Sequence, residues 1–378
     1  MANNFIYLSP PQLEKKSKEL VNLAIDSNWI APIGPFLDKF EFSLEEYLNN
    51  KKKVIALNSG TSSINISLAL LDIKREDVVL CQSFTFIATA APAHHIGAKL
   101  IFIESESKTW NMCPIFLEEA ICDSLKKGIK PKAIIAVHIY GMPFNVDEIL
   151  QISKKYNIPL IEDAAEALGS RYKNIKCGSI GNFSILSFNG NKIITTSGGG
   201  ALVVSNDELK KKAIFLSSQA KEDTPYYLHK EVGYNYRLSN ICSAIGVSQL
   251  EVLQNRVLSK REIHQFYKNY FKDIDGICVF SEPNSNYFSN YWLTCILLDP
   301  QKIKCSVKKI QECLLNNNIE SRYLWKPLHT QPVFKNQKYY GNGYSEYLFK
   351  NGLSLPSGTG LTRSNLLKIV DTISSCLN

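Results

Sequence analysis

The chain has 378 residues, of which 45% are hydrophobic and 21% charged. This is the composition of a globular protein and excludes a disordered or coiled-coil chain. The length predicts two domains, and the modest net charge of +8, with lysines in short groups that lack interleaved aromatic residues, argues against nucleic-acid binding.

Membrane insertion and export are not expected. The sequence has no run of about eighteen apolar residues, and residues 1–7 lack the basic and then apolar pattern of a signal peptide. The ten cysteines are scattered singly from Cys81 to Cys376 without a C-x-x-C pair. We therefore expect a cytoplasmic protein with reduced, buried thiols and no metal site.

The first part of the chain predicts two helices, near residues 11–25 and 35–48. The connection between them contains Asn28, Trp29 and Ile30 together with proline and glycine. Two interpretations stay open for this connection: it lines a ligand pocket, or it is a turn closed by Trp29.

A short apolar strand at residues 54–57 leads through small polar residues, including Gly60, Thr61 and Ser62, into a helix at 64–71. A helix N-terminus after a strand presents unpaired N–H groups and hydroxyls that suit a phosphate. The alternative is a simple serine or threonine N-cap. The segment has neither a Walker lysine nor G-x-G-x-x-G spacing, which excludes an NTPase loop and a dinucleotide fingerprint.

Strands and helices then alternate along the chain. Continuous apolar strands separated by helices predict a largely parallel sheet covered on both faces. Ligands of such sheets bind beyond the carboxyl ends of the strands. The predicted strands are residues 78–81, 99–103, 133–137, 160–163 and 201–204, and the helices between them lie near 115–126 and 146–156.

Asp163 directly follows one of these buried strands and precedes two alanines and Glu166. A buried carboxylate needs a cationic partner, and the alanines leave room for a flat ligand. A helix N-cap is the alternative role of Asp163. We favour the interpretation with a cationic partner.

Lys192 lies on a polar loop between the strand that ends near Phe188 and the glycines at 198–200. A lysine in a partly dry pocket has a disfavoured ammonium form and is available as a nucleophile, whereas an ordinary lysine belongs to a solvated surface. We interpret the three glycines as backbone without side chains that lets the lysine loop pass close to its surroundings.

The C-terminal part begins with a long predicted helical stretch, from Ile241 to about Phe271, that bridges into a second domain. Strands near 277–280 and 291–298 and helices at 306–316 and 362–376 follow. The expected domains are residues 1–245 and 246–378. His329 is the one candidate for chemistry in the second domain, and a plain surface histidine is the alternative.

Six segments resemble a known family, the DegT/StrS-type nucleotide-sugar aminotransferases, over nearly the whole chain. The resemblance implies an α/β fold of PLP-dependent transferase fold type I, with a large, mainly parallel sheet domain that binds pyridoxal 5′-phosphate (PLP) and a small C-terminal α+β domain. The segments are Ser59-Gly60-Thr61, residues 83–86 (SFTF), 138–141 (HIYG) and 162–166 (EDAAE), Ser187 with Lys192, and residues 233–237 (GYNYR).

The resemblance also implies a role for each site residue. Lys192 would be the Schiff-base lysine and proton carrier, Asp163 would pair with the pyridinium nitrogen, and Phe86 would stack on the ring. Glu166, which is Gln or His in many relatives, would lie near the ring hydroxyl. The phosphate would be held by Gly60, Thr61, Ser62 and Ser187 and by Asn235 of a second subunit, and the substrate-binding candidates are Asn28, Trp29, Ile30, Arg237 and His329.

Within the family, residues 27–32, 163–170, 189–200, 324–331 and 355–358 most resemble bacterial enzymes of the N-acetylbacillosamine route. The implied reaction moves an amino group from L-glutamate, which leaves as 2-oxoglutarate, to the C4 keto group of a UDP-linked 4-keto-6-deoxy-N-acetylhexosamine. The implied active unit is a homodimer with shared sites. Alternatives are a dTDP-linked or 3-keto sugar substrate, a PLP-dependent dehydratase, in which a histidine would replace Lys192, and a non-catalytic protein of the same fold.

Overall fold

The computed structural model describes residues 5–49 and 52–377. The expectation that no signal peptide is present concerns residues 1–7, so it lies partly outside the described residues. Among the described residues, no helix is both long enough and apolar enough to cross a membrane.

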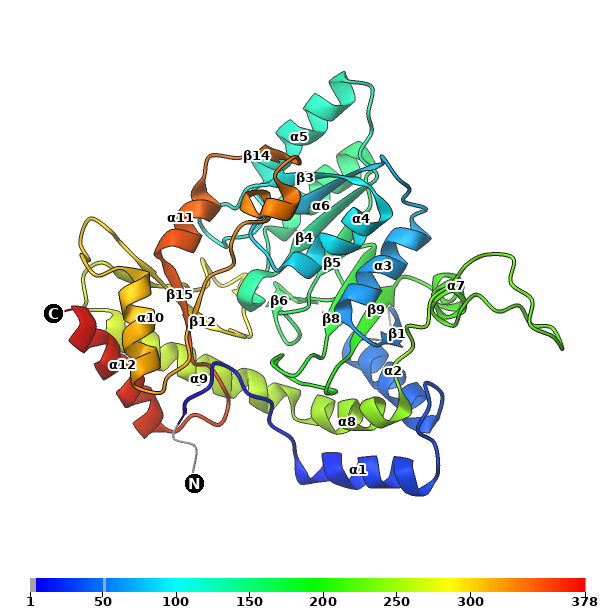
Figure 1. Ribbon diagram of the computed structural model, residues 1–378, viewed down its shortest axis with the longest axis horizontal. Helices are drawn as coiled ribbons and strands as arrows, with labels where there is room; N and C mark the ends of the chain where they lie inside the picture. Colours follow the sequence, from blue (N-terminus) through cyan, green and yellow to red (C-terminus); the bar gives the residue numbers. More distant parts are fainter. Residues whose placement is uncertain (1–4, 50–51, 378) are drawn as a thin grey trace.

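An eight-stranded sheet forms the centre of the molecule (Figure 1). Every neighbouring pair is parallel except those of β9, which runs antiparallel to β1 and β8. The largely parallel sheet predicted from the apolar strands is therefore confirmed. β9 differs because the loop of residues 188–199, which joins it to β8, contains no crossover helix and returns the chain antiparallel. The strand order is β1 (Lys53–Leu57), β9 (Gly200–Val204), β8 (Phe183–Ser187), β5 (Leu160–Asp163), β4 (Ala133–Val137), β2 (Val78–Gln82), β3 (Lys99–Ile103) and β14 (Lys338–Tyr340).

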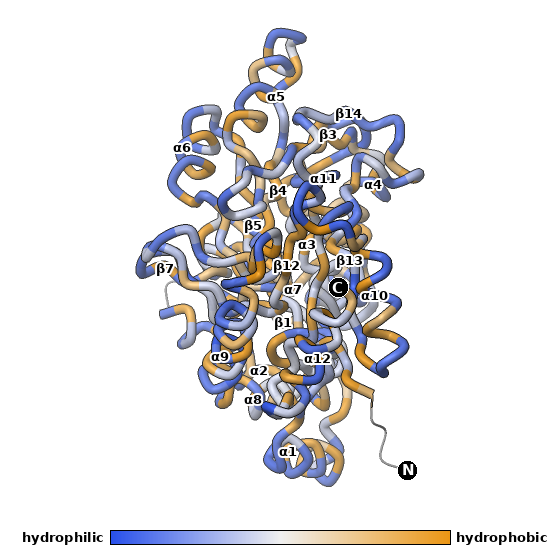
Figure 2. The backbone as a smooth tube through the Cα atoms, turned by 90° about the vertical axis from the view of Figure 1, so that its left-hand side faces the viewer, coloured by the Kyte–Doolittle hydropathy of each residue, from blue (hydrophilic) through white to orange (hydrophobic). Residues whose placement is uncertain are grey.

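Helices cover both faces of this sheet because successive strand residues point to opposite sides. In β1, Ile55 and Leu57 pack with α3 (Gly60–Leu70), α4 (Ala91–Ile96) and α7 (Asp207–Ser217). Val54 and Ala56 pack on the other side, with α2 (Pro35–Tyr47) and α8 (Asn240–Glu251). α5 (Pro114–Lys126) and α6 (Val146–Tyr156) lie on the same face as α2 and α8, over the half of the sheet formed by β5, β4, β2 and β3. Figure 2 shows the hydrophobic chain in the middle and more hydrophilic turns of helix at the outside.

α1 (Lys15–Asp26) packs against α8 at the lower edge of the molecule in Figure 1. The predicted bridging helix is two helices, α8 and α9 (Leu253–Phe271). The predicted helical stretch is confirmed, with an interruption at Val252. The N–H of Val252 bonds to the carbonyl of Gln249, three residues back, which tightens the last turn of α8.

The C-terminal part contains an antiparallel sheet with the order β10 (Ile277–Val279), β12 (Thr294–Leu298), β15 (Gly352–Leu355) and β13 (Arg322–Tyr323). Its core is shared with α9, α10 (Val307–Asn316) and α12 (Arg363–Leu377). α11 (Tyr344–Asn351) follows β14, the strand that returns to the large sheet beside β3. A third, small sheet joins β11 (Tyr287–Phe288), β6 (Arg171–Tyr172) and β7 (Ile175–Lys176).

Two cysteines depart from the expectation of reduced thiols. Cys313 on α10 and Cys376 on α12 form a disulfide, and the other eight cysteines are free. The two residues are 63 positions apart and meet only because α10 and α12 pack side by side, so the spacing of cysteines in the sequence did not reveal the pair.

Candidate active site

A cavity of about 490 Å³ lies at the carboxyl ends of β4, β5 and β8. Polar groups singled out in the sequence meet there because parallel strands end at the same edge of the sheet. Its lining includes Asn58, Ser59, Gly60, Thr61, Phe86, Thr89, Asp163, Glu166, Ser187, Asn191, Lys192, Trp292, Arg322 and Trp325.

Lys192 enters this cavity from the loop between β8 and β9. The loop is closed by a hydrogen bond from the N–H of Phe188 to the carbonyl of Gly199, at 2.9 Å. A Cβ atom at Gly199 would lie 2.1 Å from Oγ1 of Thr196, and one at Gly200 would lie 2.3 Å from the backbone carbon of Ser59. The close approach expected of the glycines is therefore confirmed at these two positions, whereas Gly198 faces open space.

The amine of Lys192 lies among acidic and aromatic groups. Its Nζ is 3.8 Å from Oε1 of Glu166 and 4.2 Å from the centre of the Trp292 ring, and only 14% of the side chain is exposed. Burial lowers the pKa of Lys192, and the charges of Glu166 and Asp163 oppose this effect. The amine is therefore well suited to act as a nucleophile and to exchange a proton.

Trp292 reaches the lysine loop from the C-terminal part of the chain. Its indole Nε1–H donates to the carbonyl of Asn191 at 2.8 Å. Its own carbonyl accepts a hydrogen bond of 2.9 Å from Nζ of Lys260, a buried lysine on α9 that also donates to the carbonyl of Ser357. Burial, helped by the charge of Arg256, lowers the pKa of Lys260 to about 7. These contacts hold the ring of Trp292 against Lys192.

Asp163 ends β5 and is almost fully buried. Its Oδ2 accepts a hydrogen bond from Oγ1 of Thr89 at 2.8 Å, and its Oδ1 accepts one from the N–H of Ala165 at 3.1 Å. Burial raises the pKa of Asp163, and the bond from Thr89 counters part of that rise. No α-helix starts directly after Asp163, so the N-cap alternative is wrong, and the carboxylate is available to a cation in the cavity.

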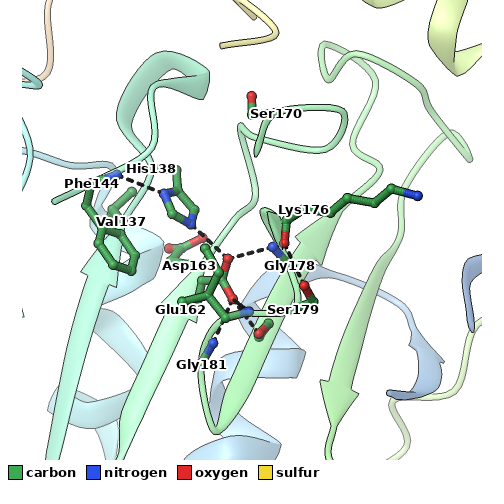
Figure 3. Close-up of polar contacts among 12 residues, drawn as sticks. Val137, His138, Phe144, Glu162, Asp163, Ser170, Lys176, Gly178, Ser179 and Gly181 are labelled. Carbon is green, nitrogen blue, oxygen red and sulfur yellow. Dashed lines mark hydrogen bonds and ion pairs between the residues drawn. The ribbon is translucent and has the colours of Figure 1, made fainter. Parts of the chain in front are cut away.

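On the same strand, Glu162 lies in a fully buried hydrogen-bond network (Figure 3). Its carboxylate accepts hydrogen bonds from Nε2 of His138 at 2.8 Å and from Oγ of Ser184 at 2.6 Å. Backbone N–H groups of Gly178, Ile180 and Gly181 donate to the same carboxylate. Burial alone would raise the pKa of Glu162, but the hydrogen bond and charge of His138 and the other donors bring it below its ordinary value.

This network has the residue types of a metal site, but His138 and Glu162 use their ligand atoms in hydrogen bonds. His138, Glu162 and Cys177 place potential ligand atoms within 4.8 Å of one another. Nδ1 of His138, however, accepts the N–H of Phe144 at 3.1 Å, so Nε2 carries the proton that Glu162 receives. The five donors around Glu162 therefore serve to fix the end of β5, and with it Asp163.

The N-terminus of α3 forms the opposite end of the cavity. Ser59 caps the helix by accepting the N–H of Ser62, and the first-turn N–H groups at Gly60 and Thr61 have no partner within the helix. Ser187 lines the cavity beside them. Ser62 does not line it, because its buried hydroxyl donates to Oδ1 of Asn58 at 2.6 Å. The N-cap therefore coexists with unpaired first-turn N–H groups, which suit an anion.

Phe86 and Glu166 complete the cavity. Phe86 is 50% exposed, and its ring centre lies 5.1 Å from that of Trp325. Glu166 is buried, accepts the N–H of Tyr140 at 2.6 Å, and has its pKa raised to about 7 by burial, with Lys192 opposing the rise. A flat pyridine ring with a phosphate, a carbonyl and a ring nitrogen fits these groups, with α3 at the phosphate, Lys192 at the carbonyl and Asp163 at the nitrogen.

The other predicted binding residues do not line this cavity, although the carbonyl of Asn235 accepts a hydrogen bond from the cavity residue Asn58. Arg237 donates to Glu41 at 2.7 Å and to the carbonyl of Ala56. His329 bonds to Ser83 at 2.7 Å and stacks on Tyr339. Trp29 and Ile30 are about half exposed between α1 and α2, next to Asn28, and Asn235 is exposed on the segment after α7.

Many residues that line the cavity were not among the predicted site residues, including Thr89, Trp292, Arg322 and Trp325. Thr89 lies four residues after Thr85, which belongs to the resembling segment 83–86. Helical spacing would have brought the two hydroxyls together, as their 3.0 Å contact shows. Trp325 lies within the resembling segment 324–331 and Arg322 lies two residues before it, but no local pattern separates them from surface residues. For Trp292 the sequence contains no signal.

Comparisons with known proteins agree with this geometry. Residues 11–374 match the DegT/DnrJ/EryC1/StrS aminotransferase family. The chain is 45% identical to a putative pyridoxal phosphate-dependent aminotransferase, EpsN, of Bacillus subtilis, over 97% of this chain and 95% of the relative. It is 34% identical to a GDP-perosamine synthase of Escherichia coli O157:H7, over 98% of both chains.

A third relative, from Campylobacter jejuni, is a UDP-4-amino-4,6-dideoxy-N-acetyl-beta-L-altrosamine transaminase that is 34% identical, over 91% of this chain and 90% of the relative. Among solved structures, a DegT DnrJ EryC1 StrS aminotransferase from Brucella abortus has a TM-score of 0.89 at 27% identity, over 96% of this chain and 95% of that one. The chain therefore belongs to the DegT/DnrJ/EryC1/StrS family and is a PLP-dependent sugar aminotransferase.

Proposed function

We propose that this enzyme moves an amino group from L-glutamate to the C4 keto group of a UDP-linked 4-keto-6-deoxy-N-acetylhexosamine, on a route to N-acetylbacillosamine. The observation that carries the proposal is the convergence of Lys192, Asp163 and the N-terminus of α3 on one cavity. The UDP-linked, N-acetylated sugar in the name of the Campylobacter relative supports the substrate class. Because nucleotide sugars and glutamate are cytoplasmic metabolites, we propose that the enzyme works in the cytoplasm.

In this proposal the chain supplies proton transfer and charge stabilisation. PLP, when bound, supplies a carbonyl for the amino group and a ring that withdraws electrons. Nζ of Lys192 removes the proton from the α-carbon of the donor in the first half-reaction and delivers a proton to C4 of the sugar in the second, which its lowered pKa favours. Asp163 holds the ring nitrogen in its protonated form, and Phe86 packs on the ring.

We further propose that the active unit is a homodimer with shared sites. Apolar side chains are exposed on three segments: the connection between α1 and α2, the Phe86 loop, and the segment between α7 and α8. This much exposed apolar surface suits a second copy of the chain better than water. The exposed fractions are Trp29 46%, Ile30 49%, Ile33 63%, Phe86 50%, Tyr226 64%, Tyr227 82% and Val232 93%.

Mixing two inactive variants tests the shared site. Lys192→Ala removes the amine of one subunit, and Asn235→Ala removes the side chain proposed to reach the neighbouring cofactor. Unfolding and reassembling the two together should restore up to about a quarter of the sites, those built from the intact halves. A monomer in light scattering, or a mixture without activity, would rule out shared sites.

Product NMR with L-glutamate tests the substrate. The enzyme is offered 4-keto-6-deoxy sugars linked to UDP, dTDP or GDP, and a 3-keto sugar linked to dTDP. The GDP-linked substrate is included because GDP-perosamine synthases are among the relatives. We expect an amine at C4 of the UDP-linked sugar with the highest kcat/KM, and preferential turnover of any of the others would refute the proposed substrate.

A further inference from the structure

We propose that Arg322 binds the carboxylate of the amino donor, at the junction of the cofactor cavity with a second cavity of about 380 Å³. This inference rests on the proposed function, in which an amino acid supplies the nitrogen. Arg322 lies on β13 of the small sheet and lines both cavities. The two cavities also share Asn191, Trp292 and Trp325, so they adjoin around Arg322.

The guanidinium of Arg322 is held in a defined orientation. Its Nε and Nη2 donate to Oε1 of Glu320 at 3.0 and 2.8 Å. The other oxygen of Glu320 accepts the N–H of Leu8 at 2.8 Å, which ties the pair to the N-terminal segment. These bonds use one edge of the guanidinium and leave Nη1 to donate to a ligand. Since 63% of the Arg322 side chain is exposed, a ligand can reach it.

The charges around the two cavities make Arg322 the available partner for an anion. Among the described residues that line them, the cations are Lys192 and Arg322, and the acids are Asp163, Glu166 and Glu320. A carboxylate that enters such a site needs a cationic hydrogen-bond donor to offset its lost hydration. Lys192 lies beside Glu166 and is assigned to the cofactor, so Arg322 remains.

Two substrate groups share this chemistry: the carboxylate of the amino donor and the diphosphate of the nucleotide sugar. The position of Trp292 favours the carboxylate. Trp292 lines both cavities with Arg322, and its ring is 4.2 Å from Nζ of Lys192. The α-carboxylate is attached to the carbon that reacts beside Lys192, whereas a pyranose ring separates the diphosphate from a 4-keto carbon.

Measuring the two half-reactions separately tests this assignment. The visible absorbance of the bound cofactor reports amino transfer from L-glutamate in one experiment and amino transfer to the keto sugar in the other. In Arg322→Gln, the apparent Kd for L-glutamate should rise roughly 10- to 100-fold, as expected for loss of a hydrogen bond to a charged group, while the Kd for the keto sugar stays within about twofold. Arg322→Lys keeps the charge but not the planar fork, so its Kd for L-glutamate should lie between those of wild type and Arg322→Gln.

Arg363→Gln is the matched control, since it removes an exposed arginine at the start of α12. An effect confined to the keto sugar would assign Arg322 to the diphosphate and overturn the proposal. Equal effects on both half-reactions, or no effect on either, would also overturn it.

A binding measurement on the cofactor-free protein separates this inference from the proposed function. Trp292 and Trp325 line the cavity, so their fluorescence should report binding of glutarate, a dicarboxylate without an amino group. Arg322→Gln should lose this response, and UDP should not compete with glutarate. If L-glutamate fails as donor but glutarate binding still requires Arg322, the donor assignment fails and the carboxylate site stands. Glutarate binding that is unchanged in Arg322→Gln contradicts the inference.

Discussion

Replacing Glu166 with glutamine should remove a pH-dependent loss of stability from the cofactor-free protein. Glu166 is 5% exposed, and burial raises its pKa from the ordinary 4.5 to about 7. Glutamine has nearly the same shape, and its carbonyl can still accept the N–H of Tyr140. The substitution therefore removes ionisation with little change in packing.

The direction of this pH dependence follows from proton binding. Because the folded protein holds this proton more tightly than the unfolded chain, the contribution of Glu166 to the free energy of unfolding is greatest below about pH 4.5 and is lost as the pH rises through about 7. The difference between these two pKa values corresponds to about 3 kcal/mol, of which about 2.5 kcal/mol is lost between about pH 5 and pH 8.

Urea unfolding of the cofactor-free protein at about pH 5 and at about pH 8 measures this loss of stability. Wild type should lose about 2.5 kcal/mol more stability than Glu166→Gln on going from the lower to the higher pH. Titrating groups whose pKa does not depend on Glu166, such as Lys260, are present in both proteins and cancel in the comparison. Glu46→Gln, at an exposed position on α2, should show the same pH dependence as wild type. The same dependence in Glu166→Gln would refute the account of Glu166 as a buried carboxyl.

The remaining predictions concern the lysine loop, Asp163 and the disulfide. Lys192→Ala should abolish amino transfer and the visible absorbance of the bound cofactor, and an active variant would overturn the assignment. Asp163→Asn should still bind PLP but lose turnover by orders of magnitude, because an uncharged pyridine is a poor electron sink; full activity would contradict the pairing. Trp292→Leu should lower the pH at which Lys192 reacts with an amine reagent in the cofactor-free protein, since the ring favours the ammonium form by about 0.5–2 kcal/mol, and Trp292→Phe should change it less; identical pH profiles would argue against the contact. Replacing Cys313 and Cys376 with alanine should lower the free energy of unfolding by about 2–4 kcal/mol, measured without reductant, and equal stability would show that the disulfide contributes nothing.

Much of the fold was predictable because apolar runs specify strands and because parallel strands end at a common edge. That rule alone brings Asp163, Lys192 and the turn at Gly60 to one cavity. The antiparallel direction of β9 and the interruption at Val252 were not predicted, since each depends on a short connection or a single hydrogen bond.

The site residues that the sequence did not predict share one physical feature. Trp292, Lys260 and Arg322 act on the cavity from elements that are distant in sequence, and only the packing of the C-terminal part against the large sheet brings them there. Ser62, in contrast, was predicted to bind the phosphate but does not line the cavity. Its position beside Gly60 and Thr61 suggested a phosphate ligand, but its side chain turns inward to Asn58.

Transfer of labelled nitrogen tests the central claim most directly. The enzyme is incubated with PLP, ¹⁵N-labelled L-glutamate and the UDP-linked 4-keto sugar, and the sugar product is examined by NMR and mass spectrometry. We predict ¹⁵N bonded to C4 of the sugar in wild type and none with Lys192→Ala. A sugar without ¹⁵N in the wild-type reaction, or labelled product from Lys192→Ala, would contradict this account.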